Sequence, residues 1–118
     1  MASSRLHVER DPALALVVRI YIGSVAERWR VPEPVRDDLR LAASELFSGA
    51  VEAGRGDLVS FDLSTDGTRF ELSTEEIDAQ DPERPDLVGW TGRSDLIRAL
   101  FPDAEIGDSV RIRVPTFP

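Results

Sequence analysis

Hydrophobic and polar residues follow two different periods along this chain. Near the N-terminus, residues 4–9 ("SRLHVE") alternate Leu6 and Val8 with polar neighbours, which is typical of a short strand. His7 falls on the polar side of that strand, so we expect it to face solvent. It is the only histidine in the chain, and a metal site built on it would need other kinds of ligand.

Residues 11–29 change to helical spacing. Asp11 is predicted to cap this helix, with Pro12 at its first position. Leu16 and Ile20 lie four residues apart on the face of the helix that is predicted to be exposed to solvent. They are either ordinary surface residues or a contact patch for a second chain. The opposite, core-facing side is predicted to consist of Leu14, Val18, Tyr21, Ile22, Val25 and Trp29.

A second helix is predicted to start after Pro34 and to stop at Gly54 and Gly56. Its alanines would let it lie close to the layer on which it packs. The buried stripe is predicted to be Val35, Leu39, Ala42, Ala43, Leu46, Ala50 and Ala53.

The second half of the chain is predicted to form a hairpin, a loop, a helix and a strand. Asp66-Gly67 is a hairpin signal between two runs of period 2. Ser94 is a candidate N-cap for the short helix, which Pro102 follows. The ranges are 57–74 for the hairpin, 75–89 for the acidic loop, 93–101 for the helix and 108–115 for the strand.

This order favours an α+β two-layer sandwich, in which helices cover one face of a mostly antiparallel sheet. No repeat and no second domain is visible, so residues 1–118 are predicted to form a single domain.

Composition narrows the classes of function. Hydrophobic residues make up 42% of the 118 residues and charged residues 31%, as in a soluble globular protein. The formal charge of −8 argues against direct binding of nucleic acid. All fourteen cationic side chains are arginines, so a P-loop, which needs lysine, is excluded. With no cysteine, no signal-like N-terminus and no membrane-length apolar run, we expect a cytoplasmic protein.

Several stretches resemble the anti-sigma-factor serine kinases, small ATP-binding proteins of the superfamily that also contains gyrase, Hsp90 and the histidine kinases. The resemblance covers nearly the whole chain, and "DDLRLAASEL" within the second helix is its most specific part. It implies a histidine-kinase-like ATPase fold, here with a short lid. The stretches are 31–54, similar to the helix with the Asn box, 68–74, similar to the strand before the adenine box, and 94–106 with 108–115, similar to the closing helix and strand.

The resemblance also implies a site for Mg-ATP, and most of its positions are altered. Glu45 stands at the position of the catalytic base, which we expect to be idle. Gly49 stands where an asparagine holds Mg²⁺, and glycine has no side-chain oxygen to offer the metal. The aspartate and two glycines of the adenine box align with Thr74, Glu76 and Asp78.

The phosphate-covering glycines are also altered, because Thr91, Gly92 and Arg93 stand where Gly-x-Gly is expected. Shifting the alignment by one residue restores only one of the two glycines. On the second helix, Asp38, Glu45 and Glu52 project within about a quarter-turn of one another. These carboxylates would repel a triphosphate if they face the site, and on a solvated face they need no ligand.

We therefore expect neither a metal nor another cofactor. Residual Mg-ATP binding stays open, because Arg93 and Arg98 could contact phosphates.

Three candidate functions remain for this chain. The favoured one is a non-catalytic anti-sigma-type regulator that binds a sigma factor or an anti-sigma antagonist. The alternatives are an active serine kinase of such an antagonist, with Glu45 as base, and a structural homodimer that pairs through Leu16 and Ile20. No direct nucleic-acid or membrane partner is expected.

Overall fold

The computed structural model describes residues 1–53, 57–74, 88–107 and 109–117, and of residues 53 and 88–93 it describes the backbone alone. Along the chain a strand is followed by two α-helices, a hairpin of two strands, a third α-helix and two final strands. The elements are β1 (Ala2–Glu9), the 3₁₀ helix η1 (Pro12–Leu14), α1 (Ala15–Arg28), α2 (Glu33–Ala53), β2 (Leu58–Thr65), β3 (Arg69–Thr74), α3 (Val88–Leu100), β4 (Glu105–Ile106) and β5 (Val110–Pro115).

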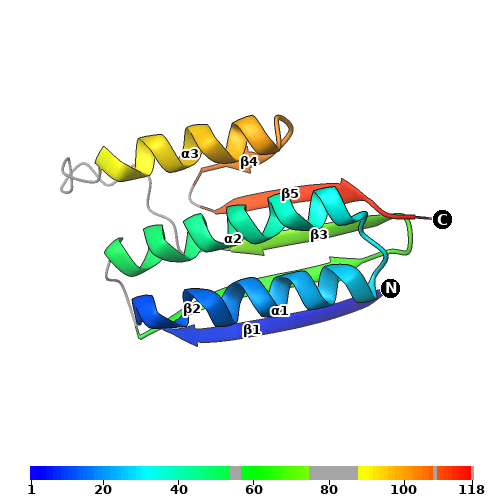
Figure 1. The fold of residues 1–118 in the computed structure, drawn as a ribbon, viewed down its shortest axis with the longest axis horizontal. Coiled ribbons are helices and arrows are strands. Elements are labelled where there is room, and N and C mark those ends of the chain that lie inside the picture. The colour runs from blue at the N-terminus through cyan, green and yellow to red at the C-terminus, as the bar shows by residue number, and fades with distance from the viewer. Residues whose placement is uncertain (54–56, 75–87, 108, 118) are drawn as a thin grey trace.

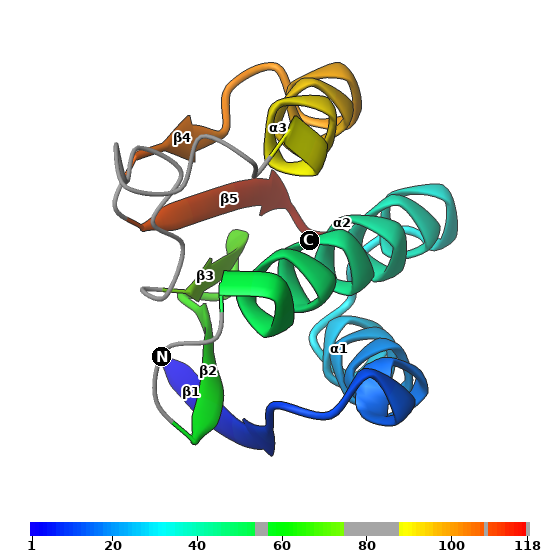
Figure 2. The same ribbon diagram turned by 90° about the vertical axis from the view of Figure 1, so that its left-hand side faces the viewer.

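Five strands form one antiparallel sheet in the order β1-β2-β3-β5-β4. The three α-helices lie side by side on one face, and the described elements leave the other face open (Figures 1 and 2). The α+β two-layer architecture predicted from the order of elements is therefore confirmed. Within the described residues, no helix has both the length and the apolar character needed to cross a membrane.

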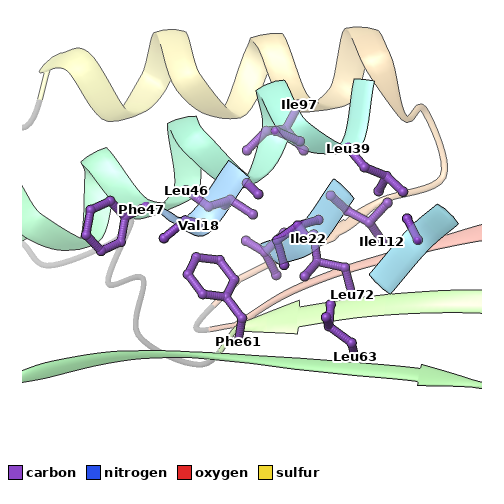
Figure 3. Close-up of a cluster of buried hydrophobic side chains, with 14 of the residues drawn as sticks. Val18, Ile22, Leu39, Leu46, Phe47, Phe61, Leu63, Leu72, Ile97 and Ile112 are labelled. Carbon is purple, nitrogen blue, oxygen red and sulfur yellow. The ribbon is translucent and has the colours of Figure 1, made fainter. Parts of the chain in front are cut away.

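The core lies between the sheet and the helices, where alternate strand residues meet the inner helix faces (Figure 3). Period 2 is maintained in β2, β3 and β5, so every second side chain is buried. The largest fully buried side chains are Phe47, Phe61, Phe70, Ile22, Leu39, Leu46, Leu63, Leu72, Ile97, Ile112, Val18 and Val31.

The first predicted helix is confirmed with one refinement at its start. Asp11 caps η1, since its Oδ1 accepts a hydrogen bond from the amide of Ala13 at 2.9 Å, and η1 leads directly into α1. Val18 and Ile22 are buried, and the rest of the predicted stripe is partly buried against the core. Leu16 and Ile20 are exposed, as predicted.

The other two helices differ from prediction at their N-termini. Helix α2 begins at Glu33, so Pro34 lies in its first turn, where a missing amide hydrogen costs nothing. Helix α3 begins at Val88, which makes the prediction of Ser94 as N-cap wrong: Ser94 lies inside the helix and is buried. Strand β4 was not predicted, because two residues are too few to show a period.

The hairpin is confirmed. Thr65 is opposite Phe70, and Gly67 adopts a φ of 93°, the positive value that tight hairpin turns require. Most of the predicted acidic loop, 75–89, lies outside the described residues.

Candidate functional site

Three segments that the sequence predicts to belong to a nucleotide site lie at one end of the molecule. These are the C-terminal half of α2, the end of β3 and the start of α3, which Figure 1 places at its left side. Helices α2 and α3 also contact each other directly. The topology therefore brings these three segments to the same end of the molecule, although they are far apart along the chain.

On α2, Glu45 is half-buried and Gly49 is buried. They are four residues apart and so lie on the same side of the helix, one turn apart. The glutamate thus occupies a protected position beside a residue that presents no ligand atom. A metal held between the two positions would receive oxygen from Glu45 alone, whereas Mg²⁺ prefers about six oxygen ligands.

Thr74 is the last residue of β3 and is only 2% exposed. The alternation of β3 places it on the helix-facing side, together with Phe70 and Leu72. Its Oγ1 donates a hydrogen bond of 2.8 Å to the backbone carbonyl of Ser60 in the neighbouring strand. The hydroxyl that the sequence predicts at the adenine-reading position therefore donates its proton within the sheet.

The remaining positions predicted from the sequence are only partly described. Gly92 and Arg93 lie within the backbone of α3, which places them in a helix. Arg98, further along the same helix, is exposed. Glu76 and Asp78 lie outside the described residues, so the predictions made for them stay predictions.

The predicted acidic stripe of α2 is only partly solvated. Glu52 is exposed, but Asp38 and Glu45 are half-buried. Asp38 and Glu45 thus lie at the margin of the helix layer, two turns apart on α2.

The open face of the sheet carries a charged network that the sequence did not reveal. The guanidinium of Arg113 donates to Glu71 at 2.7 Å and to Glu105 at 3.2 Å, and Arg111 lies 3.5 Å from Glu71 and 3.7 Å from Glu105. The hydrogen bond to Glu71 raises the pKa of Arg113, with the charge of Glu105 adding to it. The period-2 polar positions marked this face, but only the register places Glu71 opposite Arg113.

Further pairs continue this face towards β1. Arg5 Nε donates to Asp62 Oδ1 at 2.5 Å, and His7 Nδ1 lies 2.8 Å from Ser60 Oγ. Two shallow cavities, of about 230 and 480 Å³, also lie along β1, β2 and the hairpin. The lining of the first includes the pair Arg113–Glu71, and the lining of the second includes the pair Arg5–Asp62.

A search against models of known protein families finds no match for this chain, and a search of curated proteins finds none either.

Proposed function

We propose that this chain is a non-catalytic regulatory protein of the anti-sigma-factor type, with a histidine-kinase-like ATPase fold whose nucleotide site has degenerated. In this proposal it acts by binding another protein, a sigma factor or an anti-sigma antagonist. The observation that carries the proposal is an apolar surface at the start of α1.

That surface consists of Leu16, Val17 and Ile20, which we call the α1 patch. The three side chains are 56%, 47% and 58% exposed. Single apolar residues on a surface are ordinary, but three within five residues form a continuous area that water hydrates poorly. Burying such an area against a partner is the main favourable term in protein association. The patch is therefore suited to protein recognition.

The altered nucleotide positions support a function without catalysis. Gly49 supplies no oxygen where the related kinases bind Mg²⁺, and the hydroxyl of Thr74 donates to Ser60 within the sheet. Glu45 remains, but a general base needs a substrate and a metal held in front of it. The half-buried Asp38, two turns before Glu45 on α2, adds a further negative charge to this helix.

The charge of the chain fits the proposed partner class. With a formal charge of −8, the protein attracts basic surfaces, and the DNA-binding regions of a sigma factor are basic. Long-range attraction of this kind speeds association and depends on salt, while the α1 patch would provide the contact area.

Binding can be measured by titration calorimetry with purified sigma factors and antagonist domains of the same cell. The double variant Leu16→Glu, Ile20→Glu should weaken the dissociation constant at least tenfold. The matched control is Ser24→Glu with Arg28→Glu, also exposed and four residues apart on α1. Equal affinity of both double variants for a bound partner would refute the α1 patch.

The absence of catalysis has a separate test. A ligand present at 100 times its dissociation constant adds about 2.7 kcal/mol to the free energy of unfolding, which a thermal melt detects easily. We expect no shift of the melting temperature with millimolar Mg-ATP. A shift of several degrees, lost in Glu45→Gln, would instead support the serine-kinase alternative.

A further inference from the structure

A cavity of about 230 Å³ lies at the hairpin end of the sheet. In β3, Glu71 alternates with the buried Phe70 and Leu72, so it lies on the face of the sheet opposite the helices. The cavity shares no residue with the α1 patch on which the proposed function depends. Its lining includes Ser64, Thr65, Asp66, Arg69, Glu71 and Arg113.

The acidic side chains of this cavity already have partners within the protein. Glu71 Oε1 accepts a hydrogen bond from Arg113 Nε at 2.7 Å. Asp66 Oδ1 accepts from the hydroxyl and the amide of Thr68 and from the amide of Arg69. At least one oxygen of each carboxylate is therefore satisfied by the protein itself.

Several donors of the lining, in contrast, are free. No ion pair or hydrogen bond joins the exposed side chain of Arg69 to any other described residue, and the same holds for the hydroxyl of Ser64. Thr65 Oγ1 accepts from the amide of Gly67 at 3.2 Å, so its own proton is available to another acceptor. One guanidinium group and two hydroxyls thus remain as donors around the cavity.

We propose that this cavity binds a small carboxylate anion, held by Arg69 and by the hydroxyls of Ser64 and Thr65. A guanidinium group matches a carboxylate with two parallel hydrogen bonds, and charge-assisted bonds of this kind are about twice as strong as neutral ones. An ionised carboxylate only accepts hydrogen bonds, and donors are what the cavity leaves unpaired. One water molecule takes up about 30 Å³ of liquid, so the cavity has room for the carboxylate and a short carbon chain.

A single negative charge fits this lining better than two charges. Arg69 brings one unpaired positive charge, whereas the charge of Arg113 is already balanced by Glu71 and Glu105. The carboxylate of Asp66 also lines the cavity and repels further negative charge. A dianion such as phosphate would therefore gain less from this site than a carboxylate.

Titration followed by ¹H–¹⁵N correlation spectra tests the site, with sodium acetate as the probe and sodium chloride at equal ionic strength as the comparator. Acetate should shift the amide resonances of residues 64–69 to saturation with a dissociation constant of roughly 1–10 mM, as expected for so small a ligand, and chloride should not. Arg69→Gln should weaken binding about tenfold or more, and Arg69→Lys about threefold, because lysine keeps the charge but loses the planar fork. Arg19→Gln removes an exposed arginine from the helix layer and should leave acetate binding unchanged.

A second variant separates binding from folding. Asp66→Asn removes the neighbouring negative charge and should strengthen acetate binding about threefold, whereas damage to the hairpin would weaken it. Dianionic phosphate should bind more weakly than acetate, and tighter binding of phosphate would contradict the assignment of the site to carboxylates. Shifts that do not saturate, equal shifts with chloride, or an acetate response that persists in Arg69→Gln would mean an adventitious ion only and would overturn the proposal.

Discussion

The guanidinium group of Arg40 on α2 lies directly over Gly23 of α1. A Cβ atom added at Gly23 would be 2.8 Å from Arg40 Cζ and nearer still to Nε. Arg40 is held there partly by Asp37, whose Oδ1 accepts a hydrogen bond from Arg40 Nη1 at 2.7 Å. The glycine therefore lets α1 and α2 pack closely, with a charged side chain rather than an apolar one between them.

This contact predicts that substitutions at the two positions are not additive. Alanine is about 1 kcal/mol more favourable than glycine inside a helix. In Gly23→Ala that gain is cancelled, because Arg40 must leave its position and give up Asp37. In the Arg40→Ala background, Gly23→Ala should raise the free energy of unfolding by about 1 kcal/mol. Urea denaturation of the wild type, the two single variants and the double variant measures the coupling between the two positions. Additive effects would show that the contact between Arg40 and Gly23 does not affect the free energy of unfolding.

Arg30, two residues after the end of α1, has a left-handed backbone with a φ of 69°, which costs an ordinary residue about 1–2 kcal/mol. Its carbonyl accepts a hydrogen bond from the amide of Phe117 at 2.9 Å, so the C-terminal segment keeps this conformation in place. We expect Arg30→Gly to raise the free energy of unfolding by about 1 kcal/mol, measured by urea denaturation. Arg19→Gly removes the same charge from the interior of α1 and should lower it by a similar amount. A loss of stability in both variants would contradict this account of Arg30.

Asp66 organises the hairpin turn. The hydroxyl of Thr68 and the amides of Thr68 and Arg69 all donate to its Oδ1, at 2.7, 2.8 and 2.8 Å. These bonds, the hydroxyl first, lower the pKa of Asp66 from 3.8 to about 2. The folded state thus favours the charged carboxylate, and the stability this provides is complete above about pH 4 and is lost as the pH falls towards 2.

We therefore expect wild type to be more stable than Asp66→Asn at pH 6, with the difference shrinking between pH 4 and pH 2. Denaturant midpoints across this pH range give the comparison. Asp103→Asn, which removes a carboxylate from another exposed position, is the matched control. A constant gap between wild type and Asp66→Asn down to pH 2 would mean that the carboxylate charge does not stabilise the turn.

Phe47 on α2 is completely buried and lies near Phe61 of β2 (Figure 3). Phe47→Ala should lower the free energy of unfolding by about 3–5 kcal/mol, because it removes buried surface and leaves a cavity. Leu41→Ala on the same helix, at a position 43% exposed, should change it by less than about 0.5 kcal/mol. Denaturant unfolding compares the two variants. Should Phe47→Ala leave no cooperative transition, the milder Phe47→Leu provides the measurable loss.

In the candidate nucleotide region, the local sequence pattern predicts some features correctly and cannot predict others. Glu45 and Gly49 could be placed on one side of a helix from their spacing, and their burial agrees with that placement. That Thr74 donates to the carbonyl of Ser60 could not be foreseen, because this bond depends on how β2 and β3 align. Phe47 was also missed: it falls beside the predicted stripe of α2, on a side that only the packing of the helix layer covers.

The sequence by itself determined most of the elements and one buried face of each, since the periods of 2 and 3.6 residues are local properties of the backbone and its side chains. The two-layer architecture followed from their order. Only the tertiary structure decided the strand order, which leaves β1 at one edge, and the register that places Glu71 opposite Arg113. The tertiary structure also decided that α3 begins at Val88, five residues before its predicted start, and that Ser94 is buried within this helix. These features arise from contacts between segments far apart in the chain, and no local period encodes which distant segment will supply the contact.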